Sequence, residues 1–163
     1  MRGIRSIGLI ATAISLALLL AIVPAATASA AGGTTQVSGV LIPDQDGSCH
    51  EDPASQYTLD ATGNLDGCWY FESMDVAGST PSGASRGSGN ERFIGCLDGN
   101  KDQCGSFVST FTTTAKFDGA TEEHGRCNHK IVSGEGFFAH ATGVINMHDD
   151  PNGCIYYKGH ITL

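Results

Sequence analysis

The chain has 163 residues, with seventeen acidic residues against nine basic ones and a formal net charge of −8 at pH 7. This balance argues against nucleic acid and anionic lipid as partners, because both are bound through a basic face that neutralises phosphate groups. The length is that of one domain.

The first predicted element is a cleaved secretory signal peptide over residues 1–30. Two arginines precede an apolar run over residues 7–23, and Ala28 and Ala30 follow it, which is the pattern of a signal cleaved after Ala30. The alternative is an uncleaved membrane anchor, because the run is close to the minimum length of a span. Its polar positions favour cleavage, which predicts a secreted, extracellular protein without membrane association. The mature chain, residues 31–163, is predicted to be a single β-barrel domain. Loss of both arginines leaves seven basic residues against seventeen acidic ones and changes the charge from −8 to −10.

The mature chain shows the period of β-strands and no convincing helical period. Strand-like runs cover residues 35–42, 65–71, 91–97, 106–118 and 155–163, with further strand character from residue 131 onward. Residues 44–55 are acidic and rich in turn formers, and residues 76–89 are rich in Gly and Ser with one proline. This composition predicts two loops, of which the second is mobile.

The clearest alternation lies in residues 106–118, whose phenylalanine-rich face should point inward. That face consists of Phe107, Ser109, Phe111, Thr113, Ala115 and Phe117. In the last run, Ile155, Tyr157, Gly159 and Ile161 should line the interior, after an Asn152-Gly153 pair that predicts a tight hairpin turn. The predicted fold class is therefore all-β: a small antiparallel, calycin-like β-barrel of about eight strands, held together by disulfides.

All six cysteines lie in the predicted mature chain, and an even number in an exported protein predicts a disulfide framework. Six cysteines allow fifteen complete pairings. Local geometry favours Cys96 with Cys104, which would tie a short loop between two strand-like runs. Proximity in the chain then pairs Cys49 with Cys68 and Cys127 with Cys154.

Two patterns resemble metal sites. His124, Cys127 and His129 have a spacing at which nitrogen and sulfur ligands can hold zinc. In a strand, however, Cys127 and His129 share one face while His124 points to the other, and a disulfide would remove the thiolate. The segment 98–103 starts like a calcium loop but lacks its turn glycine and its closing glutamate. We therefore expect structural roles for both, and no metal or other cofactor is predicted.

The chain contains no nucleophile elbow, phosphate-binding loop or metalloprotease motif. Glu72, Glu91 and Lys116 would become candidate acid–base groups if they pointed into the barrel. His140 and His148 are expected to be surface or packing residues rather than bases. The sequence therefore predicts no particular catalytic residue.

The segment GEGFFAHATG, residues 134–143, resembles the G-T-G-x-F-x-G-A-T-G segment of secreted bacterial, actinobacterial-type proteins in the allene oxide cyclase barrel-like superfamily, to which the plant dirigent proteins are similar. The matching positions are Gly134, Gly136, Phe138, Ala141, Thr142 and Gly143. Glu135 replaces a threonine and His140 a glycine. The resemblance covers the last third of the chain well. It implies the barrel fold and homo-oligomer formation, but no catalytic role, because the motif consists of scaffold glycines.

Three hypotheses of function follow. The first is a secreted binding protein that accepts a small, partly apolar ligand among Trp69, Phe107, Phe111 and Tyr157, because an eight-stranded barrel has room for one small ligand. The second is a cyclase- or dirigent-like enzyme that confines a reactive intermediate; its sign would be a cavity with one or two buried polar groups. The third is an extracellular scaffold whose loops, residues 44–55 and 76–89, bind a partner.

Overall fold

The structure, a computed structural model, describes residues 32–163 with the exception of residues 46, 50, 51, 53, 82, 119, 120 and 151–153. The predicted signal peptide and the predicted Asn152-Gly153 turn therefore lie outside the described residues. Across the described part of the chain, no helix is long and apolar enough to cross a bilayer.

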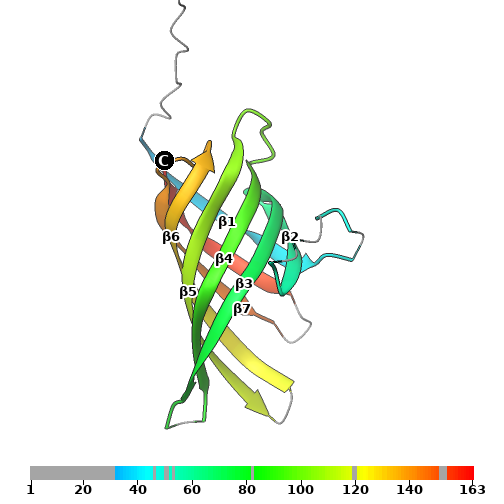
Figure 1. The fold of residues 1–163 in the computed structure, drawn as a ribbon, viewed down its shortest axis with the longest axis vertical. Coiled ribbons are helices and arrows are strands. Elements are labelled where there is room, and N and C mark those ends of the chain that lie inside the picture. Colours follow the sequence, from blue (N-terminus) through cyan, green and yellow to red (C-terminus); the bar gives the residue numbers. More distant parts are fainter. Residues whose placement is uncertain are drawn as a thin grey trace, which may run out of the picture.

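Eight strands follow one another along the chain. They are β1 (Thr34–Pro43), β2 (Tyr57–Gly63), β3 (Leu65–Ser79), β4 (Ser85–Leu97), β5 (Cys104–Asp118), β6 (Thr121–Gly136), β7 (Thr142–Asp149) and β8 (Ile155–Thr162). Each strand pairs antiparallel with the next, and β8 pairs with β1, so that the sheet closes into a barrel (Figure 1). The predicted all-β barrel is confirmed.

The wall of the barrel is higher on one side than on the other. Strands β3 to β6 contain 13 to 16 residues each, whereas β1, β2, β7 and β8 contain 7 to 10. The register of β2 on β3 ends at Phe71, and that of β7 on β6 ends at Arg126. Beyond these residues the β3–β4 and β5–β6 hairpins continue past the other strands, toward the bottom of Figure 1. We call this part the projecting wall: residues 72–79, 85–90, 111–118 and 121–125.

The prediction of a mobile loop at residues 76–89 is wrong, because most of this segment belongs to the paired strands of the projecting wall. Strand β3 continues to Ser79 and β4 begins at Ser85. Gly89 shows why the composition misleads. A Cβ at this position would lie 1.8 Å from the carbonyl oxygen of Ser73 and 2.7 Å from the ring of Phe111. The glycine therefore permits close packing within a sheet and does not mark a loop.

Apolar side chains fill the end of the barrel nearest the chain termini. Phe138, from the turn between β6 and β7, packs edge-on against Phe93 and Phe107, with ring centroids 5.9 and 5.4 Å apart. Tyr157 lies in the same core, where its hydroxyl accepts a hydrogen bond from the Leu65 N–H at 2.8 Å. The predicted alternation of residues 106–118 and 155–161 is confirmed, since the inward set includes the buried Phe107, Phe111, Tyr157 and Ile161.

Two of the three predicted disulfides are present, Cys49–Cys68 and Cys96–Cys104. The third pairing, Cys127 with Cys154, is not formed in the structure. Cys127 lies opposite Met147 of β7, and β8 follows only on the far side of β7. Two strand spacings are about 10 Å, beyond the usual Cα–Cα limit of a disulfide at about 7 Å.

Candidate functional site

The barrel holds a cavity of about 350 Å³ at the end bordered by the projecting wall. Aromatic rings from two of the long strands, those of Trp69, Phe71, Phe111 and Phe117, contribute to its lining. They come from β3 and β5, and the register places them there because inward positions recur at every second residue of a strand. Aliphatic side chains from the short strands, among them Leu59 and Met147, complete the apolar surface.

The aromatic rings form a continuous row. Phe71 packs against Phe111 with ring centroids 5.5 Å apart, and Phe111 packs against His129 at 5.4 Å. Trp69 packs edge-on against His129, with ring centroids 5.9 Å apart. Because these side chains are buried and packed against one another, they hold one another in fixed rotamers and give the cavity a defined wall.

A buried carboxyl group interrupts this apolar lining. Glu91 of β4 is 7% exposed, and the indole Nε1–H of Trp69 donates a hydrogen bond to its Oε2. His129 Nε2 lies 2.9 Å from the same oxygen, but without the alignment of a hydrogen bond. We therefore describe the His129 contact as electrostatic. The hydrogen bond from Trp69 therefore holds the carboxyl group in the cavity wall.

Buried polar atoms without a hydrogen-bond partner gather around Glu91. Within the described part of the chain, they are both ring nitrogens of His129 and the hydroxyl of Ser109. Ser109 lies directly across from Glu91 in the β4–β5 register and is fully buried. Such groups are rare because each carries the cost of its lost hydration. Their concentration beside a cavity favours a functional role for this place in the barrel.

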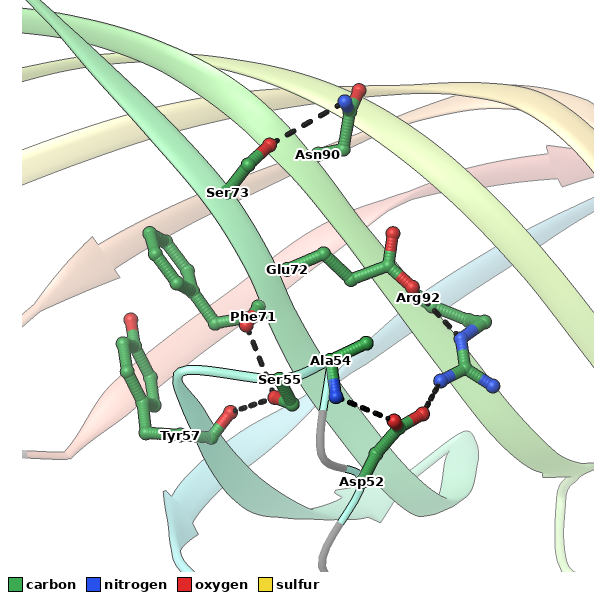
Figure 2. A network of polar contacts seen from close by, with 9 residues as sticks. All are labelled: Asp52, Ala54, Ser55, Tyr57, Phe71, Glu72, Ser73, Asn90 and Arg92. Atoms are coloured by element: carbon green, nitrogen blue, oxygen red, sulfur yellow. Dashed lines mark hydrogen bonds and ion pairs between the residues drawn. The ribbon is translucent and has the colours of Figure 1, made fainter.

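Tyr57 stands at the mouth of the cavity, where its ring stacks on Phe71 with centroids 4.6 Å apart. Ser55, just before it, fixes this end of β2, because its one hydroxyl proton is shared between the carbonyl oxygens of Phe71, at 3.0 Å, and of Tyr57, at 2.7 Å (Figure 2). The sequence places a serine here because its short hydroxyl reaches nearby backbone groups.

An ion-pair network on the outer face of the barrel holds the segment before β2. Arg92 contacts Glu72 at 2.9 Å and also binds Asp52 (Figure 2). Burial disfavours the charge of Arg92, but hydrogen bonds to both carboxylates outweigh this effect and raise the pKa of the guanidinium. The pKa of Asp52 is lowered, first by the backbone N–H of Ala54 and then, against partial desolvation, by Arg92.

The structure separates the candidate ligand-binding residues into two groups. Trp69 and Phe111 line the cavity, whereas Phe107 and Tyr157 lie in the filled core. Of the three acid–base candidates, only Glu91 points inward. Glu72 binds Arg92 on the outer face, and Lys116 is exposed.

His129 is the residue whose role the sequence did not reveal. It appeared only as part of the zinc-like pattern, and the structure confirms that His129 and Cys127 line one cavity while His124 is exposed. The available signal was its place in the alternating series Cys127, His129 and Ile131, opposite Phe111 of the neighbouring strand.

Asp44, Cys49 and Asp60 bring possible metal ligands within 4.8 Å of one another, but the Cys49 sulfur belongs to a disulfide and offers no thiolate. A larger hollow of about 1010 Å³ lies along β5, β6 and β7. It is open and lined mainly by exposed polar residues such as Thr112, Arg126 and Asn146. We therefore regard the barrel cavity as the candidate site.

Fold and site together define a closed, eight-stranded antiparallel β-barrel with disulfides and a cavity at one end. Models of known protein families do not match this chain, and no curated protein is significantly similar to it.

Proposed function

We propose that the protein binds one small, mostly apolar molecule in the open end of its barrel. The observation that carries this proposal is the cavity of about 350 Å³, whose mostly apolar lining contains the buried carboxyl group of Glu91. Sites for small molecules are concave and mostly apolar, with a few polar groups that orient the ligand, and their volumes begin at about 300 Å³.

The mouth of the cavity supports the same proposal. Tyr57, Met74 and Phe117 contribute to the lining and are 48%, 40% and 44% exposed. Large apolar side chains exposed together at the entrance of a cavity favour the approach of an apolar molecule. Exposure of these side chains to water costs free energy, and a bound ligand would cover part of their surface and recover part of that cost.

Trp69 is the only tryptophan of the chain and lines the cavity, so its fluorescence reports directly on occupancy. We would purify the mature protein from its host's medium, identify any retained compound by native mass spectrometry, and titrate that compound into emptied protein. A saturable change of Trp69 fluorescence is expected, and it should weaken in Phe111→Ala, which removes part of the wall. Ile94→Ala, an exposed outer-face change, is the control. An unchanged affinity in Phe111→Ala would contradict the proposed site.

We infer further that the protein works outside the cell. Two disulfides favour an oxidising compartment, and the signal-like residues 1–30 supply the export route. N-terminal sequencing of the secreted protein is expected to begin at Ala31. An intact N-terminus in the membrane fraction would overturn this inference.

An isomerase- or cyclase-like enzyme is the second candidate, and one observation favours it. Glu91 and His129 are two buried polar groups beside a mostly apolar cavity, as an enzyme that confines a reactive intermediate would need. If this candidate is right, Glu91→Gln should bind the retained compound yet fail to convert it. Conversion by Glu91→Gln at an unchanged rate would rule out Glu91 as the catalytic group, and no conversion by the unsubstituted protein would leave ligand binding as its function. The scaffold hypothesis is weaker, because residues 76–89 are largely strand.

A further inference from the structure

We infer that the ligand is an organic cation: an aliphatic or aromatic molecule that carries a protonated amine, which binds against the carboxylate of Glu91. This inference rests on the proposed binding function and names the chemical class of its ligand. Three features of the cavity carry it: the free oxygen of Glu91, the distribution of charge around the lining, and the faces of the aromatic rings.

The first feature is the uneven use of the two oxygens of Glu91. Trp69 Nε1 and His129 Nε2 both approach Oε2. Within the described part of the chain, no group makes a hydrogen bond or ion pair to Oε1. A buried carboxylate is costly unless its oxygens are paired. Because Glu91 lines the cavity, a donor on the ligand is the partner that Oε1 can still gain.

The second feature is the charge of the lining. Among the described lining residues, the only lysine or arginine is Arg86, which is exposed at the rim, where Asp149 also lies. His129 is the only other basic group beside Glu91, and its ring is not aligned to donate a hydrogen bond to Oε2. An anionic ligand would therefore meet Glu91 as a like charge, and a purely apolar one would leave Oε1 desolvated without a partner. A cation avoids the repulsion and also gives Oε1 a partner.

The third feature is the row of aromatic rings around Glu91. Ring faces carry partial negative charge and attract cations within about 6 Å of the centroid. Phe71 and Phe111 both line the cavity next to the strand of Glu91. An ammonium group at Oε1 would have these rings nearby, while its hydrocarbon body would contact the apolar lining. The net negative charge of the chain adds a long-range attraction for cations.

The experiment compares ligands that differ only in their head group. The mature protein is titrated at pH 7 and low salt with 3-phenylpropylammonium, 3-phenylpropanol and 3-phenylpropanoate, and with the corresponding hexyl series, while Trp69 fluorescence is recorded. We expect the Kd of the ammonium compound to be lower than that of the alcohol by at least about tenfold, because a charge-assisted hydrogen bond replaces a neutral one. The carboxylate compound should bind most weakly.

Two variants assign the preference to its cause. Glu91→Gln keeps the shape of the side chain and an oxygen for Trp69, and it should bring the ammonium and alcohol affinities within about twofold of each other. Glu135→Gln changes the net charge by the same amount at an exposed position of β6, and it should keep the preference. Circular dichroism and the urea midpoint establish that both variants fold.

The outcomes separate the two proposals. Alcohol binding as tight as ammonium binding, or a preference for the carboxylate compound, overturns the cation while the binding function stands. An ammonium preference that survives Glu91→Gln also overturns it. If no compound of either series alters Trp69 fluorescence and native mass spectrometry finds no retained molecule, the binding function itself fails, and the inference fails with it.

Discussion

Trp69 and Glu91 form a hydrogen bond between two neighbouring strands, with the indole Nε1–H of β3 donating to Oε2 of the β4 carboxylate. The register sets Trp69 opposite Phe93 and Glu91 opposite Phe71, so the two partners are diagonal neighbours on the inner face. The bond thus joins the filled core of the barrel to the wall of its cavity.

This bond should be visible as an energetic coupling. Trp69→Phe leaves the buried carboxylate with one partner fewer, and we expect a loss of about 2 to 4 kcal/mol in the free energy of unfolding. In a double-mutant cycle with Glu91→Leu, which removes both acceptor oxygens, the coupling energy should be at least about 1 kcal/mol. Urea unfolding followed by circular dichroism measures both. Additive effects would mean that the bond contributes nothing to stability.

The barrel should lose stability in strong alkali through Tyr157. Desolvation is the main reason that the pKa of its hydroxyl is raised to about 12, and Asp98 and Asp66 add to the effect. Because the folded-state pKa lies above the ordinary value of 10.0, the contribution of Tyr157 is fully present below pH 10 and is lost as the pH rises toward 12. Absorbance at 295 nm should show one of the four tyrosines titrating late.

Tyr157→Phe is the control for this pH dependence. The late tyrosinate transition should vanish in that variant, and the decline of its unfolding midpoint between pH 10 and pH 12 should be shallower. The same late transition in the variant would assign it to another tyrosine.

Gly89 and Gly83 offer a matched test of why the β3–β4 hairpin is rich in glycine. Gly89→Ala would force a methyl group against backbone, and we expect a loss of about 3 kcal/mol or more. Gly83 has φ of +84°, but no heavy atom lies within 4 Å of the place that an added methyl group would take, so Gly83→Ala should cost only about 1 kcal/mol. Equal costs would contradict the close packing at Gly89.

The two disulfides should differ in their effect on stability. Cys49–Cys68 spans 19 positions and Cys96–Cys104 spans 8. In the chain-entropy account, removal of the first as a double alanine variant should cost about 0.8 kcal/mol more than removal of the second, within a usual range of about 2 to 4 kcal/mol for each. Thermal or urea unfolding of both variants measures the difference.

The remaining two cysteines can be tested chemically. Since Cys127 and Cys154 form no disulfide in the structure, alkylation of the denatured, unreduced protein should add two groups, and peptide mapping should place them at these positions. An unalkylated protein with three disulfides would restore the predicted third pairing.

Period-2 alternation predicted most of the barrel, because strands such as β5 keep strictly alternating faces over many residues. It could not predict the length of β3 and β4, since glycine and serine serve close strand packing as well as loops. It also missed His129. Opposite β5, the partner of Val108 is Ser133 and that of Ser109 is Ile131, so Val132 forms an irregularity in β6. The inward face of the segment after this bulge therefore cannot be extended back to the series that contains His129, and bulges have no reliable signal in a single sequence.

The filled end of the barrel has a kinetic consequence. Phe138, Phe93 and Phe107 pack across one end, so in the described part of the chain the ligand that we propose would enter and leave at the opposite end. Dissociation of one ligand molecule would then have to precede association of the next. In a chase experiment, the dissociation rate should not depend on the concentration of competitor, so the residence time would be set by the bound ligand and the entrance residues alone.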